Sequence, residues 1–65
     1  MFIVVNGQSQ QLRRPQTLAV LLLSLTPQPP FAVALNEEVV PRGSFEGCWV
    51  YPGDRIDIIH PTAGG

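Results

Sequence analysis

The sequence contains no lysine, and its four positively charged side chains are all arginines. Without a lysine, no side chain offers the ε-amine through which proteins are joined by amide bonds. The net charge is −1, and Arg13 and Arg14 are too few to form the basic stripe that nucleic-acid binding needs. We therefore expect no nucleic-acid partner.

Cysteine and histidine occur once each, as Cys48 and His60. A single cysteine excludes an internal disulfide framework and is typical of a reducing compartment. The sequence has no cluster of cysteines and histidines with metal-ligand spacing, so we expect no metal site. It also has no glycine-rich phosphate loop with a lysine, so we expect no ATP or other cofactor to be bound by the chain itself.

Long apolar runs are missing as well. No segment approaches the ~18 apolar residues of a membrane-spanning helix, and no charged segment followed by an apolar one indicates a signal peptide. Together with the single cysteine, these absences predict a cytoplasmic protein with no membrane partner.

The chain has 65 residues, which predicts one domain with a small core. A domain of this size buries only about 60% of the surface that its unfolded chain exposes, which leaves little room for a catalytic cavity. Charged residues make up 14% of the sequence, compared with ~25% in typical proteins. A surface with so few charges favours docking to a partner protein, and we expect the free chain to be a monomer.

The first half of the sequence predicts a hairpin followed by a helix. Residues 2–5 are an apolar run, and Asn6-Gly7 is the strongest two-residue hairpin signal, so residues 8–13 are the expected return strand. Residues 14–16 are a connector, and Thr17 is a helix N-cap. Pro27 ends the helix. The apolar stripe of this helix, at i, i+3, i+4 and i+7, is Leu18, Leu21, Leu22 and Leu25.

The second half predicts short strands separated by turns. Residues 31–35 alternate large and small apolar side chains, and residues 36–38 form a turn before a short strand at residues 39–40. Residues 43–47 are a loop or a single helical turn, and residues 48–50 fit a further short strand. After a turn at residues 52–54, residues 55–59 alternate as the final strand, which Pro61 ends.

This order of elements predicts an α+β fold, with a mixed sheet of four or five strands packed on one helix. Because a helix makes the crossover between the second and third strands, the arrangement is the β-grasp, or ubiquitin-like, fold. It places the first and last strands side by side and parallel at the centre of the sheet. We expect residues 1–60 to form the domain and residues 61–65 to form a flexible C-terminal tail.

Strand alternation divides the expected sheet into two faces. The face that the helix covers carries Ile3, Val5, Val33, Leu35, Ile56 and Ile58. The other face keeps apolar side chains without a partner in the chain, which commonly marks a docking site. The predicted partner-binding residues on that face are Phe2, Val4, Ala32, Ala34 and Ile59. In the alternative interpretation, a loop or the short strand covers this face.

The sequence ends in Ala63-Gly64-Gly65. A terminal glycine preceded by a second glycine can pass through a slot that is too narrow for larger residues. Its α-carboxyl group, with a pKa of about 3.3–3.7 in model compounds, is an ionised oxygen nucleophile at neutral pH. These properties suit a carboxylate that is offered to the active site of another protein, although many chains also end in small, inert residues.

Three short motifs follow one another along the chain. They are Ala-Leu-Asn-Glu-Glu-Val-Val-Pro-Arg at residues 34–42, Gly-Asp-Arg-Ile-Asp-Ile at residues 53–58, which leads into the final strand, and the terminal Ala63-Gly64-Gly65. In this order and spacing they resemble the ThiS family, the sulfur carriers of thiamin biosynthesis. The corresponding family motifs are Ala-Ile/Val-Asn…Val-Pro-Arg, Gly-Asp…Ile and the terminal Gly-Gly, and the likeness covers nearly the whole chain.

The resemblance implies that other proteins do the chemistry. A ThiF-like adenylyltransferase would use ATP to adenylate Gly65, and sulfur from a donor protein's persulfide would displace AMP and leave a thiocarboxylate. Thiazole synthase would then take the sulfur. The chain would be a protein cosubstrate and not an enzyme, with Gly65 as the modified residue, Ala63 and Gly64 as its tail, and no catalytic residue.

Two other functions remain open at this stage. Small subunits of molybdopterin synthase share the Gly-Asp and Gly-Gly motifs, and His60-Pro61 resembles that type, but these subunits are usually longer and lack the Val-Pro-Arg segment. The other alternative is a non-covalent β-grasp interaction module with an inert tail.

Three single side chains have more than one interpretation. Cys48 is either a packed strand thiol or a persulfide carrier. His60 is a solvated or partner-facing residue beside the tail. Arg42 is either a contact to a partner or the structural ion-pair partner of Glu37 or Glu38.

Overall fold

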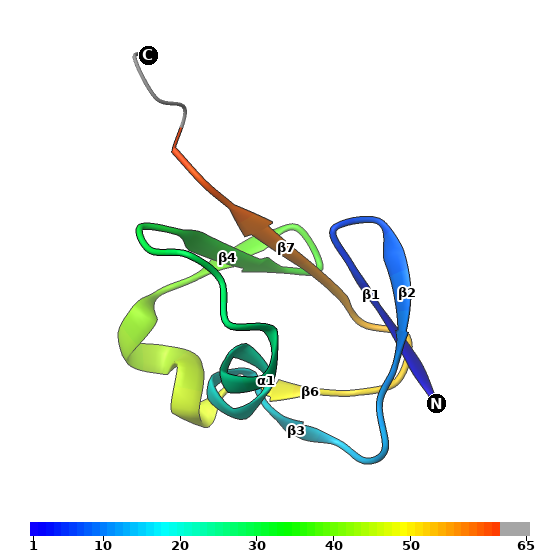
Figure 1. Cartoon of the computed structure of the whole chain (residues 1–65). Coiled ribbons are helices and arrows are strands. Elements are labelled where there is room, and N and C mark those ends of the chain that lie inside the picture. The colour runs from blue at the N-terminus through cyan, green and yellow to red at the C-terminus, as the bar shows by residue number, and fades with distance from the viewer. Residues whose placement is uncertain (62–65) are drawn as a thin grey trace.

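A computed structural model describes residues 1–61 of the chain, and residues 62–65 lie outside this description. The sheet lies on one side of the helices in Figure 1. In chain order, the elements are β1 (Phe2–Val5), β2 (Gln8–Gln11), β3 (Gln16–Thr17), α1 (Leu18–Leu25), β4 (Ala32–Leu35), β5 (Glu38–Val40), the 3₁₀ helix η1 (Arg42–Gly47), β6 (Trp49–Val50) and β7 (Arg55–Ile59).

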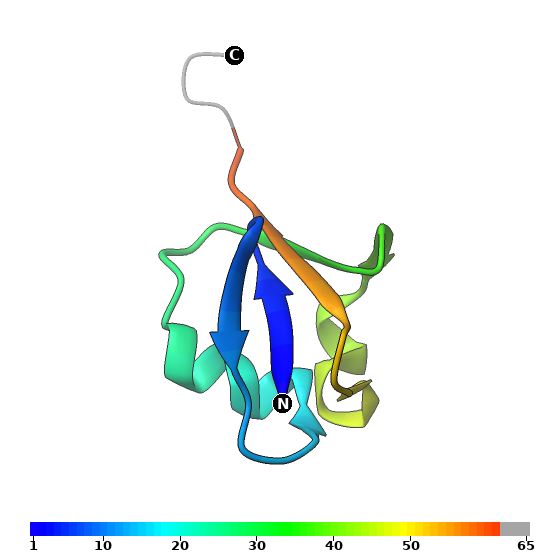
Figure 2. The same ribbon diagram turned by 90° about the vertical axis from the view of Figure 1, so that its right-hand side faces the viewer.

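The main sheet has five strands in the order β2-β1-β7-β4-β5. β1 and β7 are parallel neighbours, with Val4 level with Arg55 and Val5 level with Ile56. The β1–β2, β4–β5 and β4–β7 pairs are antiparallel. The predicted β-grasp fold, with the first and last strands parallel at the centre of the sheet, is therefore confirmed (Figures 1 and 2).

Both hairpins of this sheet have a two-residue turn with the same backbone conformation. Asn6 and Gly7 have φ angles of 50° and 80°, and Asn36 and Glu37 have φ angles of 51° and 72°. Left-handed φ angles at both central positions are what a type I′ turn requires, and they favour Asn followed by Gly. The first turn matches the prediction, whereas the second is one residue shorter than predicted and holds a glutamate where glycine would be unstrained.

α1 begins and ends where the sequence predicts. Thr17 has an extended backbone, and its Oγ1 accepts a hydrogen bond from the backbone N–H of Val20 at 3.3 Å, which is N-cap geometry. At the other end, Thr26 is left-handed with φ of 45°, and its N–H donates to the carbonyl of Leu22 at 2.8 Å. Pro27 follows and cannot continue the helix.

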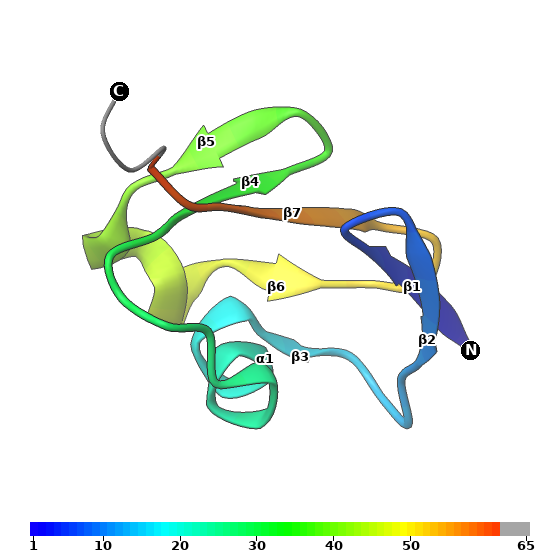
Figure 3. The same cartoon turned by 45° about the horizontal axis from the view of Figure 1, so that its top comes forward.

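A second, two-stranded sheet of β3 and β6 was not predicted. Residues 14–16 were expected to be a connector, but Gln16 pairs with Val50 and Thr17 pairs with Trp49. The backbone N–H of Leu18 also donates to the carbonyl of Cys48 at 2.7 Å. Strands of two residues carry no recognisable periodicity, so tertiary packing sets this pairing. It ties the start of α1 to the segment that leads into β7 (Figure 3).

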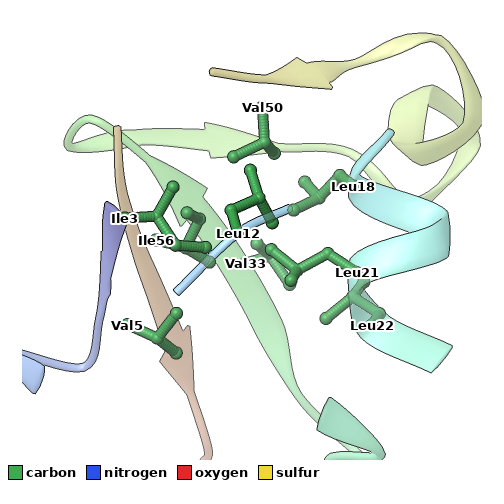
Figure 4. Close-up of a cluster of buried hydrophobic side chains, with 9 residues drawn as sticks. All are labelled: Ile3, Val5, Leu12, Leu18, Leu21, Leu22, Val33, Val50 and Ile56. Carbon is green, nitrogen blue, oxygen red and sulfur yellow. The ribbon is translucent and has the colours of Figure 1, made fainter. Parts of the chain in front are cut away.

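The core lies between the main sheet and α1, and its side chains converge from both (Figure 4). Its buried members are Ile3, Val5, Leu12, Leu18, Leu21, Leu22, Val33, Val50 and Ile56. Three residues that were expected to be core members are only partly buried at its margin, namely Leu25, Leu35 and Ile58. Leu12 and Val50 were not predicted, because neither belongs to a periodic segment long enough to assign a face.

We expect truncation of the α1 stripe to unfold much of this small domain. Leu21→Ala and Leu22→Ala each remove buried atoms and leave a cavity, at a cost of ~2–5 kcal/mol in the free energy of unfolding. Urea denaturation followed by circular dichroism measures this cost. Leu23→Ala is the matched control, because Leu23 lies on the same helix and is 78% exposed. Equal midpoints for Leu21→Ala and the control would contradict this packing.

Candidate functional site

The candidate site is the end of β7, where the chain leaves the sheet toward its C-terminus (Figure 1). Ile59, the last residue of β7, pairs with Ala32 at the start of β4. The ring of the next residue, His60, lies 6.5 Å from the ring of Phe31, centroid to centroid. We call His60 and Pro61 the tail root. The predicted modification site and its tail lie outside the described residues; they are Ala63, Gly64 and Gly65.

Asn6 holds β7 beyond the point where β1 stops. The N–H of Asn6 donates to the carbonyl of Ile56 at 2.9 Å, which completes the β1–β7 ladder. Two residues later, the N–H of Ile58 donates to Asn6 Oδ1 at 2.7 Å. The asparagine side chain therefore takes the place of the backbone acceptor that β1 no longer supplies. It extends the fixed part of β7 toward the tail root.

A second asparagine fixes the start of β7. Asn36 Oδ1 accepts a hydrogen bond from the N–H of Arg55 at 2.9 Å, and Asn36 Nδ2 donates to Asp54 Oδ1 at 3.2 Å. Asp54 Oδ2 in turn accepts from the N–H of Tyr51 at 2.8 Å. Asn36 and Asp54 belong to two of the three motifs singled out in the sequence. In the structure, both side chains position the strand that carries the tail root.

The face of the main sheet opposite α1, here called the outer face, carries the predicted docking residues. Phe2, Ala32 and Ile59 are exposed there, and Val4 is half-buried. Ile59 is 48% exposed and precedes the tail root directly. Apolar surface of this kind is therefore available to a partner close to the point where the tail leaves the sheet.

Ala34 corrects the sequence-based expectation for this face. It was predicted to be exposed, but its side chain is only 6% exposed. It lies between Asp57 of β7 and Val39 of β5, whose larger side chains leave its methyl group below the surface. Val39 itself is 69% exposed and was missed. The two-residue turn before β5 could have revealed it, because that turn sets Val39 opposite Ala34.

The outer face is not one continuous apolar patch. An ion pair between Arg55 Nε and Asp57 Oδ2, at 3.1 Å, lies on β7 between its two apolar parts. Val4 is level with Arg55. Arg55 lies four residues before Ile59, a separation of about 13 Å along the strand. Phe2 lies further still from the tail root. The apolar residues on the β4–β5 side of this ion pair, here called the tail-side patch, are Ala32, Val39 and Ile59. Ala32 and Ile59 lie beside the tail root, and Val39 lies two strands from β7, level with Asp57.

The side chains with open interpretations lie apart from one another. Cys48 is half-buried and packs against the core, as expected for a packed thiol, but it lies between η1 and β6 and not in a strand. Arg42 is exposed, and within residues 1–61 it forms no ion pair with Glu37 or Glu38, so the structural pairing considered for it is absent. In that same part of the chain, no group of three His, Cys, Asp or Glu side chains could hold a metal ion. No helix among the described residues is long and apolar enough to cross a membrane.

Comparisons with known proteins find a family and similar solved structures, two of which are described below. The sequence profile of the ThiS family matches residues 3–65. The crystal structure of a thiamine biosynthesis protein, ThiS, from Geobacter metallireducens is similar with a TM-score of 0.89 and 28% identity, over all of both chains. An NMR solution structure of a thiamine biosynthesis protein from the same organism is similar with a TM-score of 0.80 and 28% identity, over all of this chain and 88% of that chain. A search of curated protein sequences finds no match.

We expect Asn6→Gly to loosen the end of β7 and leave the turn intact, because glycine keeps the left-handed φ but loses the Oδ1 acceptor. A hydrogen bond contributes ~1 kcal/mol, so the Ile58 amide should exchange about fivefold faster relative to the core amide of Val33. Native-state hydrogen exchange by NMR measures this ratio. Asn36→Gly is the matched control and should affect the Arg55 amide instead. An unchanged ratio at Ile58 would contradict the role given to Asn6.

Proposed function

The chain belongs to the ThiS family, and we propose that it carries sulfur in thiamine biosynthesis as a thiocarboxylate on Gly65. The observation that carries this proposal is the family match, which extends to residue 65 and so includes the terminal Gly64-Gly65 pair. The likeness to thiamine biosynthesis proteins of Geobacter metallireducens supports the same pathway. In this role the chain is a protein cosubstrate of cytoplasmic enzymes, and it binds no cofactor of its own.

The proposed chemistry takes place at the carboxylate of Gly65, in the active sites of partner enzymes. A ThiF-like adenylyltransferase joins the carboxylate oxygen to the α-phosphate of ATP and releases pyrophosphate. The terminal sulfur of a donor protein's persulfide attacks the acyl carbon, and AMP leaves. A thiol then attacks the donor cysteine's sulfur in the resulting acyl disulfide, forms a disulfide with it, and releases the thiocarboxylate of Gly65. Thiazole synthase is the proposed acceptor of that sulfur.

The chain's own contribution is to present the tail. Stabilising charge on a nucleotide phosphate needs converging cations, and the chain's arginines are scattered along its length without any lysine. Residues 61–65 span at most about 17 Å when extended, so Gly65 can enter a buried active site while the domain docks outside it. Two successive glycines suit a narrow entrance to such a site. A partner that closes around the tail would also keep water from the acyl-adenylate.

The tail-side patch is the proposed contact with the adenylyltransferase. Ala32 and Ile59 lie on the outer face next to the tail root, and Val39 lies on the same face, across β4 from Asp57. Phe2 and Val4 were predicted to belong to the same contact, and they lie beyond the Arg55–Asp57 ion pair. A standard interface buries about 800 Å² on each partner, enough to include them as its periphery.

Mass spectrometry of the intact chain tests the proposed function. After incubation with ATP, the cognate adenylyltransferase and a sulfur source, the mass should correspond to one oxygen replaced by sulfur. Deletion of Gly65, or Gly64→Leu, should abolish this change while the thermal melting curve stays that of the wild type. Loading of Gly64→Leu at the wild-type rate would contradict a narrow entrance. A wild-type chain that never gains sulfur would instead favour a non-covalent interaction module.

We expect Ile59→Asp to weaken binding to the adenylyltransferase by about tenfold or more, because a charge replaces apolar contact area at the centre of the proposed interface. Isothermal titration calorimetry with the cognate enzyme measures the dissociation constant. Val20→Asp is a closely matched control, since Val20 is 49% exposed, Ile59 is 48% exposed, and Val20 lies on α1. Equal weakening of binding by Ile59→Asp and Val20→Asp would contradict an interface centred on the tail-side patch.

A further inference from the structure

A second apolar surface lies on the helix side of the sheet, between α1, the loop after it and η1. It is an open groove of about 390 Å³. Figure 3 shows α1 and η1 on the same side of the main sheet, away from the outer face. The larger residues that line the groove are Leu22, Leu23, Pro27, Phe31, Arg42 and Phe45.

The groove is lined mostly by apolar side chains. α1 contains no charged residue, and Leu23 at the groove is 78% exposed. Phe31 and Phe45 pack against the core with one part of their surface and line the groove with another. An exposed leucine beside two accessible aromatic rings matches what a protein partner's apolar anchor residue contacts.

Among residues 1–61, Arg42 is the only charged residue that lines the groove. Arg42 is exposed, and it forms no ion pair with an acidic side chain of residues 1–61. The ion pair in that part of the chain joins Arg55 and Asp57. A guanidinium at the margin of an apolar groove is complementary to a carboxylate that stands next to an apolar side chain. The groove therefore fits a protein segment in which an acidic residue flanks an apolar anchor.

The groove and the tail-side patch border the tail root from opposite sides. Phe31 lines the groove, and its ring lies 6.5 Å from the ring of His60 in the tail root. On the outer face, Ile59 and Ala32 of the tail-side patch pair at the last position of β7. The residues that line the groove do not include any of the tail-side patch. A partner at the groove and a partner at the tail-side patch would therefore contact different residues beside the same tail root.

We infer that the groove docks the persulfide-bearing sulfur donor, which would present an acidic residue beside an apolar anchor; this inference rests on the function proposed above. An acyl-adenylate hydrolyses unless its site excludes water, so the donor must arrive while the carrier is still bound to the adenylyltransferase. With the tail-side patch occupied by that enzyme, the donor needs a different surface close to the tail root. The groove is such a surface, and its single positive charge gives the contact its specificity.

The test separates adenylation from sulfur loading. Arg42→Glu should leave pyrophosphate release at the wild-type rate, because the tail-side patch is unchanged. It should raise the concentration of donor protein needed for half-maximal thiocarboxylate formation by about tenfold, since like charges then meet at the groove. Arg13→Glu is the matched control, with the same change of charge at an exposed arginine outside the groove, and should behave as the wild type.

Inorganic sulfide in place of the donor protein bypasses the docking step. Under that condition Arg42→Glu should form thiocarboxylate at the wild-type rate. Leu23→Ser tests the apolar part of the contact and should raise the half-maximal donor concentration several-fold, with its folding checked by thermal melting.

Three results would overturn the inference. They are a normal donor requirement for both groove variants, a defect of Arg42→Glu that persists with sulfide, and an equal defect in Arg13→Glu. Failure of the proposed function is a different result, in which the wild type forms no thiocarboxylate with either sulfur source.

Discussion

The parallel pairing of β1 with β7 is the interaction on which the rest of the structure depends. β7 is the last strand in the sequence, yet it lies at the centre of the main sheet, between β1 and β4. Its inner side chain Ile56 is fully buried in the core. Where β1 ends, the side chain of Asn6 continues the ladder to Ile58, and where β7 begins, Asn36 binds the N–H of Arg55. The strand that carries the tail root is thus held on both edges and near both ends.

A tail that follows so constrained a strand starts from a fixed point on the domain. Both faces of the sheet meet at that point, because Ile59 pairs with Ala32 on the outer face and His60 approaches Phe31 on the helix side. A partner that binds either face near this end of the sheet is therefore close to the point from which the same tail starts. This geometry suits the proposed carrier role, in which several proteins act on the tail in succession, and the small size of the domain leaves little room for a catalytic cavity of its own.

The sequence predicts the parts of this fold that have strong local signals. Asn6-Gly7 marks a turn by its backbone requirement, the leucine stripe marks α1 by its period, and the alternation of residues 55–59 marks β7. The β3–β6 pair escapes prediction because two-residue strands have no period. Leu12 is buried because the chain turns toward the core after β2, and no local sequence pattern predicts that turn.

The candidate site is predictable to a similar degree. Alternation assigns Phe2, Ala32 and Ile59 to the outer face correctly. Alternation assigns a side chain to a face but does not show how far its cross-strand neighbours cover it. It therefore could not show that the larger neighbours of Ala34 bury its methyl group. Alternation also places Arg55 on this face, where its ion pair with Asp57 interrupts the apolar surface. The terminal diglycine is visible only in the sequence, because residues 62–65 lie outside the described structure.

Fragmentation of the loaded chain in a mass spectrometer identifies the atom that receives sulfur. The chain offers two positions for the added sulfur, the carboxylate of Gly65 and the thiol of Cys48. The account predicts the mass shift in C-terminal fragments that contain Gly65, with every fragment that ends before Gly65 unchanged. A shift that resides in fragments containing Cys48 and is absent from those of the C-terminus would contradict it.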